Sequence, residues 1–268
     1  MSGRVDIVSI GVLAPGLAGW PAARAALAGT LAFAAHDVEP PPSPRLAAAE
    51  RRRLNPNAQW ALAVAGEALD AAPQFARAAL ASVFASADGD GAVLAQTLAA
   101  LAVLPVVLSP TLFHNSVFNA PAGYCSIAHR LTGPSTSICA GEFTFGAGLT
   151  DAVDQVLVDG TPVLFVAVDV AYPQSLARMH PSVPSFACAM LLCAAGAHPP
   201  SPMGSLALVP ATADAACAAA MPDWTRHWSA TSVASALPLL AAIAHGAPAR
   251  LDFAQPARAR LAIDYRPC

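Results

Sequence analysis

Apolar and polar positions along the chain follow two alternating patterns, one typical of strands and the other typical of helices. Runs of β-branched and other apolar residues predict strands at residues 5–11, 80–86, 135–139, 163–170, 185–194 and 206–210. Apolar positions at helical spacing predict helices over residues 20–31, 57–69, 92–103, 114–130, 143–158 and 232–245. Two further strand-like segments, at residues 251–254 and 260–265, predict a hairpin after the last helix.

The alternation of strands and helices predicts an α/β fold, with helices layered over a central sheet. The strand at residues 163–170 is almost entirely apolar, as expected for a strand covered on both faces. Asn57 is the predicted N-cap of the helix that follows it. We expect one domain over residues 5–211, with a C-terminal helix and β-hairpin over residues 212–268 as an appendage of the same domain.

The composition changes this picture in one respect. Hydrophobic residues make up 56% of the chain and charged residues only 12%, whereas soluble domains usually carry about a quarter charged residues. Either part of the surface is buried against another subunit, or the surface of an Ala-rich helical protein is simply bland; we favour the interface. All basic residues are Arg, the net charge is -3, and no long basic run exists, which argues against a nucleic-acid partner.

The spacing of the cysteines and the length of the apolar segments indicate whether the protein is cytoplasmic or spans a membrane. The six cysteines show no metal-ligand spacing and lie mostly in apolar stretches, so we expect reduced thiols, a cytoplasmic protein, and neither a metal nor a cofactor. Residues 91–113 carry no charge and are long enough to span a bilayer. Gln96, Pro105 and a high Ala content favour instead a buried helix followed by a loop, so no membrane span is predicted.

The segment from residue 108 to residue 149 resembles the region around the nucleophilic cysteine of β-ketoacyl-acyl-carrier-protein synthases. The features that carry the resemblance are Ser109-Pro110, Asn119, Gly123, Gly133-Pro134-Ser135, the strand Thr136-Ser137-Ile138 and the elbow Ala140-Gly141-Glu142. The likeness extends over roughly residues 5–210. It implies half of a thiolase-like fold, a layered α/β/α arrangement with a mixed central sheet.

Two departures from that family bear on function. Condensing enzymes need a thiolate at a strand-to-helix elbow, and the aligned position here is Glu142. Its carboxylate would be stabilised by the helix dipole but cannot carry an acyl group as a thioester. Cys139 lies within the preceding strand and is expected to be buried and inert, and Cys125 lies on a helix.

The second departure is that the second half of a complete synthase, which carries two catalytic histidines, has no counterpart here. His245 resembles one of those histidine motifs only weakly and is expected at a helix end. His114 and His129 fall in the matched half but not at catalytic positions, and are interpreted as partly exposed or hydrogen-bonded residues.

This combination resembles the chain-length factor subunits of aryl polyene and xanthomonadin-type pigment biosynthesis. The resemblance implies a pseudoenzyme that forms a heterodimer with a full-length ketosynthase and meets acyl carrier protein only indirectly. The interface residues would be the strand before the elbow, Ser135, Thr136, Ser137, Ile138 and Cys139. The acyl tunnel would be lined by Phe113, Val117, Phe118 and Phe143, unless the Phe residues fill this subunit's own core.

Two other functions stay open at this point. Glu142 could act chemically, as a general base or in decarboxylation of a malonyl thioester, which would make the chain an enzyme. Alternatively the chain could be a homodimeric acyl-binding module. Under the partner-subunit interpretation, Glu142 is structural or directed to the interface, paired with an Arg of this chain or of its partner, because a buried unpaired carboxylate is costly.

Overall fold

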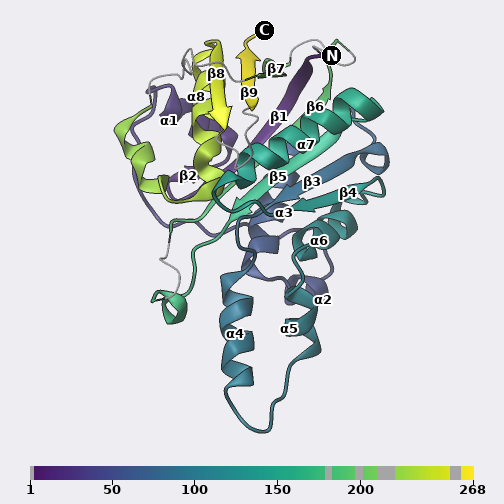
Figure 1. Ribbon diagram of the computed structural model, residues 1–268, viewed down its shortest axis with the longest axis vertical. Helices are drawn as coiled ribbons and strands as arrows, with labels where there is room; N and C mark the ends of the chain where they lie inside the picture. Colours follow the sequence, from purple (N-terminus) through teal and green to yellow (C-terminus); the bar gives the residue numbers. More distant parts are fainter. Residues whose placement is uncertain (1–2, 179–182, 197–201, 211–220, 254–260) are drawn as a thin grey trace.

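A single mixed β-sheet organises the molecule (Figure 1). The computed structural model describes all residues except 1–2, 179–182, 197–201, 211–220 and 254–260. In spatial order the strands are β4 (Ser135–Ile138), β3 (Ala81–Ala85), β5 (Val163–Asp169), β6 (Phe186–Ala194), β1 (Val5–Ala14), β7 (Ser205–Pro210), β9 (Leu261–Arg266) and β8 (Ala249–Phe253). A two-residue strand, β2 (Leu17–Ala18), turns back onto the end of β1.

The direction of pairing changes along the sheet. Strands β4, β3 and β5 are parallel, whereas the contacts from β5 through β6, β1, β7 and β9 to β8 are antiparallel. Strand β5 is buried along its whole length, as its continuous apolar run predicts. The predicted mixed central sheet and the C-terminal hairpin are therefore confirmed.

Helices cover both faces of the sheet and complete three layers. One face packs against α1 (Trp20–Leu27), α7 (Thr144–Asp159) and α8 (Leu237–His245), with Phe145 and Phe165 in contact at its centre. The other face packs against α3 (Pro56–Asp70) and α6 (Ala120–His129). The layered α/β/α arrangement expected from the sequence is confirmed, and it matches a thiolase-like ketosynthase fold.

The N-cap of helix α3 lies two residues before the predicted one. The side chain of Asn55 accepts a hydrogen bond from Ala58 N at 2.8 Å, and Pro56 occupies the first turn, where its missing N–H costs nothing. Asn57, predicted as the cap, lies inside the helix instead. Its backbone N–H donates to Asp90 Oδ2 at 3.0 Å, which ties α3 to the turn after β3.

The segment between β3 and β4 departs most from prediction. It forms three helices, α4 (Gly91–Leu101), α5 (Pro110–Asn115) and α6, so the predicted helix over residues 114–130 is wrong. The division follows from Pro110 and Pro121, which lie in the first turns of α5 and α6. Predicted burial of α4 is also wrong, because only Gly91 and Val93 of its first turn are buried and the rest extends beyond the sheet (Figure 1).

A membrane-crossing role finds no support in these elements. Among the helices of the described chain, none is both long enough and apolar enough to cross a bilayer.

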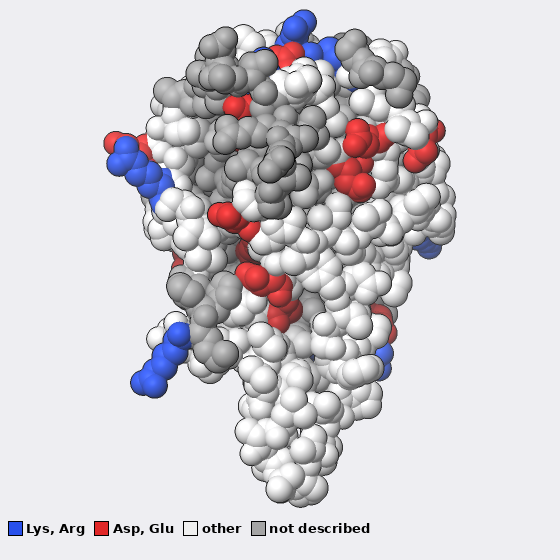
Figure 2. Space-filling model, viewed as in Figure 1, with Lys and Arg blue, Asp and Glu red and all other residues white. Residues whose placement is uncertain are grey.

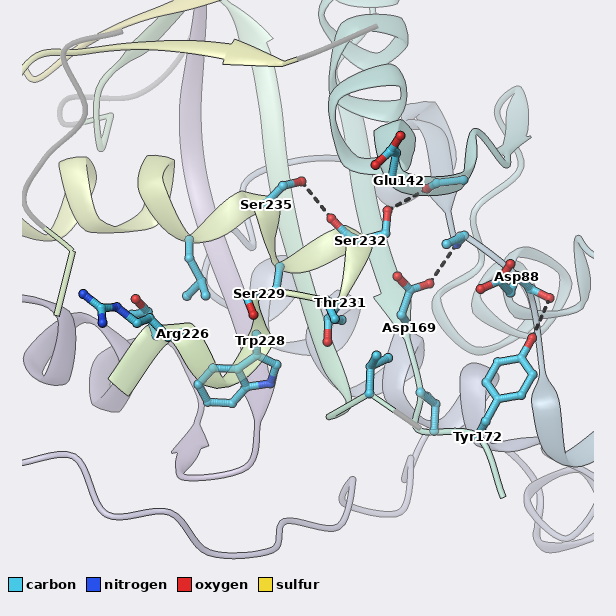
Figure 3. Close-up of a pocket in the computed structure, with 18 of the residues that line it drawn as sticks. Asp88, Glu142, Asp169, Tyr172, Arg226, Trp228, Ser229, Thr231, Ser232 and Ser235 are labelled. Carbon is cyan, nitrogen blue, oxygen red and sulfur yellow. Dashed lines mark hydrogen bonds between the residues drawn. The ribbon is translucent and has the colours of Figure 1, made fainter. Parts of the chain in front are cut away.

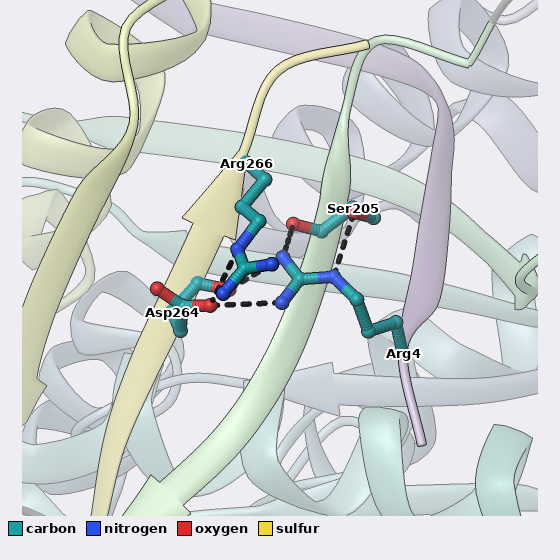
Figure 4. A network of polar contacts seen from close by, with 4 residues as sticks. All are labelled: Arg4, Ser205, Asp264 and Arg266. Atoms are coloured by element: carbon teal, nitrogen blue, oxygen red, sulfur yellow. Dashed lines mark hydrogen bonds and ion pairs between the residues drawn. The ribbon is translucent and has the colours of Figure 1, made fainter. Parts of the chain in front are cut away.

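The two ends of the described chain meet on the sheet (Figure 4). The guanidinium of Arg4, next to the start of β1, donates to Ser205 Oγ and Asp264 Oδ2, both at 2.8 Å, and also to the carbonyl oxygens of these two residues. Arg266 forms a second ion pair with Asp264 at 3.2 Å. Through β7 and β9, the C-terminal hairpin thus continues the same sheet that begins with β1.

Candidate functional site

The strand-to-helix elbow after β4 is the first feature of the candidate site. Gly141 adopts a left-handed backbone conformation, with φ of 56°, which glycine accepts most readily. Thr144, fully buried at the start of α7, donates to Gly141 O at 2.7 Å and accepts from Ala140 N at 3.0 Å. Ser232 also donates to Gly141 O, at 2.7 Å. These bonds fix the elbow between β4, α7 and the C-terminal part of the chain.

Glu142 occupies the tip of this elbow. Glu142 is exposed. It lines the wall of an open pocket of about 640 Å³. Among the described residues, no Arg pairs with Glu142. The expectation of an Arg partner within this chain is therefore not met in the part that the structure describes.

The pocket lies where the ends of β3 and β5 meet the elbow and the 3-10 helices η4 (Asp223–Trp228) and η5 (Ser232–Ala236) (Figure 3). Its wall carries the carboxylates of Asp88, Glu142 and Asp169, along with Ser, Thr and Tyr hydroxyl groups. No group of His, Cys, Asp and Glu in the described chain is placed to hold a metal ion. The pocket therefore offers hydrogen-bonding groups and negative charge, but no thiol nucleophile on its wall.

Asp169, at the end of β5, joins three elements beneath this pocket. Its Oδ1 accepts from Ala87 N at 2.8 Å and from Ser86 Oγ at 3.2 Å, and its Oδ2 accepts from Val233 N at 3.2 Å. Burial raises the pKa of this carboxyl to about 6, although the three hydrogen bonds act in the opposite direction. Both oxygens are engaged by the protein, so Asp169 holds β3, β5 and η5 together.

The cysteines of the matched segment are not placed as nucleophiles. Cys139 was expected to be buried, and this prediction is wrong: it is exposed just after β4, with Sγ at 2.7 Å from Ala87 O. The strand ends one residue earlier than predicted, so this side chain lies at its end. Cys125 is buried on α6, and burial raises the pKa of its thiol well above the usual range. Cys217 lies outside the described residues.

The histidines lie apart from the elbow. His114 is exposed on α5, where its ring contacts Tyr124 edge-on. His129 is buried at the end of α6 and its Nδ1 lies 3.4 Å from Nη1 of Arg77, in line with the prediction of a hydrogen-bonded residue. Burial together with Arg77 lowers the pKa of its ring to about 4. His245 is the last residue of α8, with Gly246 as a left-handed cap, as predicted. None of these three rings lines the 640 Å³ pocket.

Two of the predicted tunnel residues come together in a smaller pocket. Val117 and Phe118, in the turn between α5 and α6, line a pocket of about 210 Å³ with Val93 and Leu94 of α4. Phe113 is exposed on α5 and Phe143 is half-buried at the elbow, and neither lines this pocket. None of the three predicted Phe residues belongs to the buried core.

The predicted interface strand lies at an edge of the sheet. On one side β4 pairs with β3, where Ser82 N donates to Pro134 O at 2.9 Å and Ser86 N donates to Ile138 O at 3.1 Å. Because backbone groups alternate in direction along a strand, the N–H and C=O groups of Ser135 and Ser137 point to the open side. The edge therefore presents unpaired backbone groups that another strand can bind.

Sequence reasoning missed Asp169 and Ser232. The sequence contained a signal for Asp169, because this carboxylate follows the apolar run of β5 directly. It therefore lies at the carboxyl end of a buried strand, where functional side chains gather in α/β sheets. No sequence pattern pointed to Ser232, because its hydrogen bond to Gly141 joins residues that are far apart in the chain.

The three-layer arrangement and the strand-to-helix elbow at the pocket agree with the ketosynthase-like fold expected from the sequence. A family model described as the N-terminal domain of β-ketoacyl synthases matches residues 23–248. The chain belongs to the β-ketoacyl synthase family. A comparison with curated protein sequences finds no match.

Solved structures share the fold at low sequence identity. The complex of a ketosynthase (ApeO) with its chain length factor (ApeC) from Xenorhabdus doucetiae contains a chain that is 22% identical, with a TM-score of 0.69 over 97% of this chain and 99% of that one. The ishigamide ketosynthase/chain length factor gives 14% identity and a TM-score of 0.72, covering 99% of each chain. A type II polyketide synthase complex of acyl-carrier protein with its ketosynthase (AntDE:AntF) gives 10% identity and 0.76, covering 100% of each.

Proposed function

We propose that this chain is a non-catalytic, chain-length-factor-like partner of a full-length β-ketoacyl synthase, in aryl polyene biosynthesis or a related fatty-acid- or polyketide-type pathway. The observation that carries the proposal is the strand-to-helix elbow held by Thr144, where Glu142 occupies the position at which the family resemblance implies a thiol. A subunit that keeps the fold and the elbow but not the nucleophile is suited to support a partner's reaction.

The chemistry of the nearby side chains supports this role. Acyl transfer needs a thiolate that can form a thioester, and a carboxylate such as that of Glu142 does not provide one. Cys139 precedes the elbow and its Sγ lies against Ala87 O. The thiol of Cys125 is held neutral by burial. Buried free thiols also suit a reducing, cytoplasmic location.

The smaller pocket supports a role in limiting chain length. Val117 and Phe118 form the apolar part of its wall with Val93 and Leu94, beside polar residues that include Asn55 and Asp90. If a partner closes this space, forcing extra methylene groups against these bulky side chains would cost about 1–3 kcal/mol. In the proposed heterodimer, an acyl chain growing on the partner would reach this pocket across the interface and stop there. Phe113 and Phe143 would contribute only where the partner completes the tunnel.

The proposed partner is a full-length ketosynthase that binds along the open edge of β4, with acyl carrier protein delivered to that partner. The open backbone groups of Ser135 and Ser137 support this arrangement. Two structural neighbours are complexes of a ketosynthase and a chain length factor, and a third is a complex of a ketosynthase with an acyl-carrier protein, which supports this choice of partners.

Replacing Glu142 by Gln tests the proposal in a reconstituted pair. The amide keeps the size of the side chain and removes its charge, so product formation should stay within about twofold of wild type if Glu142 takes no part in the chemistry. The measurement is product yield and chain length by liquid chromatography with mass detection.

As a control, size-exclusion chromatography of the Glu142→Gln variant with its ketosynthase partner shows whether the two subunits still assemble. Loss of turnover by more than about tenfold with the complex intact would contradict the proposal. That outcome would support the competing function, decarboxylation of a malonyl thioester by Glu142, which the position of this carboxylate on the pocket wall permits.

A further inference from the structure

A single buried polar residue attaches the wall of the smaller pocket to the rest of the molecule. The turn at residues 116–119 joins α5 to α6 and carries Val117 and Phe118, which line the pocket of about 210 Å³. In the stretch from residue 94 to residue 119, all of which the structure describes, Asn115 is the only buried residue, with 7% of its surface exposed. Apolar burial within this stretch therefore does not hold the turn in place.

Charged side chains of this segment do not hold the turn either. No Asp, Glu, Lys or Arg occurs between residues 91 and 129. Figure 2 shows no charged side chain on the visible face of the projecting end, which Figure 1 identifies as α4 and α5. The segment itself thus supplies no carboxylate, ammonium or guanidinium group for an ion pair, and neutral hydrogen bonds are left to attach it.

Asn115 makes three hydrogen bonds to the elements on both sides of the turn. Its Nδ2 donates to Arg53 O at 2.6 Å, and its Oδ1 accepts from the hydroxyl group of Tyr124 at 3.1 Å. Its backbone oxygen accepts from Nδ2 of Asn55, the N-cap of α3, at 3.2 Å. Tyr124 lies on α6, so Asn115 joins α5 to two helices that pack against the sheet.

Burial makes this arrangement selective for one position of the turn. An amide group that leaves its partners in a buried site exposes unpaired donors and acceptors, which is unfavourable, so Asn115 is fixed between Arg53 and Tyr124. Phe118 follows Asn115 closely in the chain, and the buried Ala120 fixes the other end of the turn. The ring of Phe118 lies beside Gly89, where an added Cβ atom would be 3.7 Å from its Cδ2.

We infer that Asn115 is a positioning residue for acyl-chain length: through its hydrogen bonds it fixes Val117 and Phe118 and thereby sets the depth of the smaller pocket. The inference rests on the proposed function, which assigns this pocket to the far end of the acyl chain. It adds that the length limit depends on a polar contact behind the wall as well as on the size of the wall residues.

Two substitutions in the full-length chain test the inference in the pair reconstituted with a β-ketoacyl synthase of the same organism. Asn115→Leu removes both side-chain hydrogen bonds and should raise the ratio of longer products to the main wild-type product about tenfold, because the wall is released. Tyr124→Phe removes only the hydroxyl group and should raise this ratio about threefold. Liquid chromatography with mass detection measures the ratio, and size-exclusion chromatography checks assembly.

Ser9→Ala is the matched control for loss of a buried hydrogen bond elsewhere. Ser9 Oγ donates to Ala68 O at 2.7 Å, and Ser9 does not line the smaller pocket. This variant should leave the product ratio within about twofold of wild type, even where it lowers stability.

Phe118→Ala shows whether Asn115 acts through the wall. This variant removes the ring directly and should itself give longer products. Adding Asn115→Leu to it should change the ratio by less than about twofold, because the ring that Asn115 positions is already gone.

An unchanged ratio in the assembled Asn115→Leu and Tyr124→Phe pairs, or a shift only toward shorter products, would overturn the inference and leave the proposed function intact. A shift of the same size in Ser9→Ala, or a full further shift on adding Asn115→Leu to Phe118→Ala, would overturn it as well. If the Asn115→Leu pair does not assemble, the ratio given by Tyr124→Phe decides by the same criterion. A wild-type pair that does not assemble or gives no product would overturn both the inference and the proposed function.

Discussion

Thr144 shows how a single side chain sets the geometry of the elbow. Its hydroxyl group both accepts from Ala140 N and donates to Gly141 O, and the residue is fully buried. Thr144→Val keeps the shape but leaves the N–H of Ala140 without its partner, so the free energy of unfolding should fall by about 1–3 kcal/mol. Urea denaturation measures the change.

Thr144→Ser is the control for this prediction, because it keeps the hydroxyl group and removes only a methyl group. It should recover most of the lost stability. If the Val and Ser variants were equally stable, the hydrogen bonds of Thr144 would not be what holds the elbow.

Asp169 predicts a pH dependence of stability. Its pKa is raised to about 6 in the folded protein, chiefly by burial, so the folded state binds a proton more tightly than the unfolded state does. The contribution of this group to the free energy of unfolding should therefore decrease as the pH rises from about 4 to about 6, and stay low above pH 6.

Asp169→Asn does not titrate and serves as the comparison. The difference in unfolding free energy between the two proteins, measured by urea denaturation at several pH values, should change within that window and be constant above pH 7. A difference that is constant from pH 4 to pH 7 would contradict the assigned pKa.

At this scale the sequence singled out Glu142 but missed the residues around it. Glu142 was found because it stands in a motif whose spacing is local. Ser232 donates to the elbow at Gly141 O, and Asp169 accepts from the neighbouring Val233 N. Both contacts join segments that are far apart in the chain. Cys139 was expected to be buried because it was placed within the strand, but β4 ends at Ile138 and lies at the edge of the sheet in the described chain.

At the scale of elements, the edge strand β4 gives a prediction about assembly. The N–H of Ser137 points away from β3, so Ser137→Pro should remove a group from the open edge without breaking the ladder to β3. We expect the isolated subunit to keep its thermal transition within about 3 °C, as for a surface change, while co-purification with the ketosynthase is strongly reduced.

Ser137→Ala keeps the backbone N–H and should bind like wild type in the same co-purification experiment. Unchanged complex formation by the folded Pro variant would show that the partner does not pair with β4.

The elements themselves were predicted unevenly, for physical reasons. Strand β5 and helix α8 were found because a continuous apolar run and a terminal Gly246 are strong local signals. The helix predicted over residues 114–130 was wrong because apolar periodicity continues across the turn at residues 116–119. Pro110 and Pro121 were the available signals for the two helix starts.

At the scale of the whole molecule, the sequence predicted the layers but not the projection. Alternating strands and helices suffice to predict a sheet covered by helices. The low share of charged residues indicated that the surface of this chain carries less charge than is usual for a soluble domain. The absence of charge in residues 91–113 was interpreted as burial within this subunit. In the structure most of these residues form an exposed helical projection, because a lack of charge does not distinguish an apolar segment packed in the core from one that extends beyond it.

The direct test of the whole account is native mass spectrometry of the complex formed with a full-length β-ketoacyl synthase, after incubation with an acylated carrier protein. Native spectra give the stoichiometry, and denatured spectra show which polypeptide carries the acyl group. The account predicts equal numbers of the two subunits, with the acyl mass on the synthase alone. An acyl adduct on this chain, or no complex between the two proteins, would contradict it.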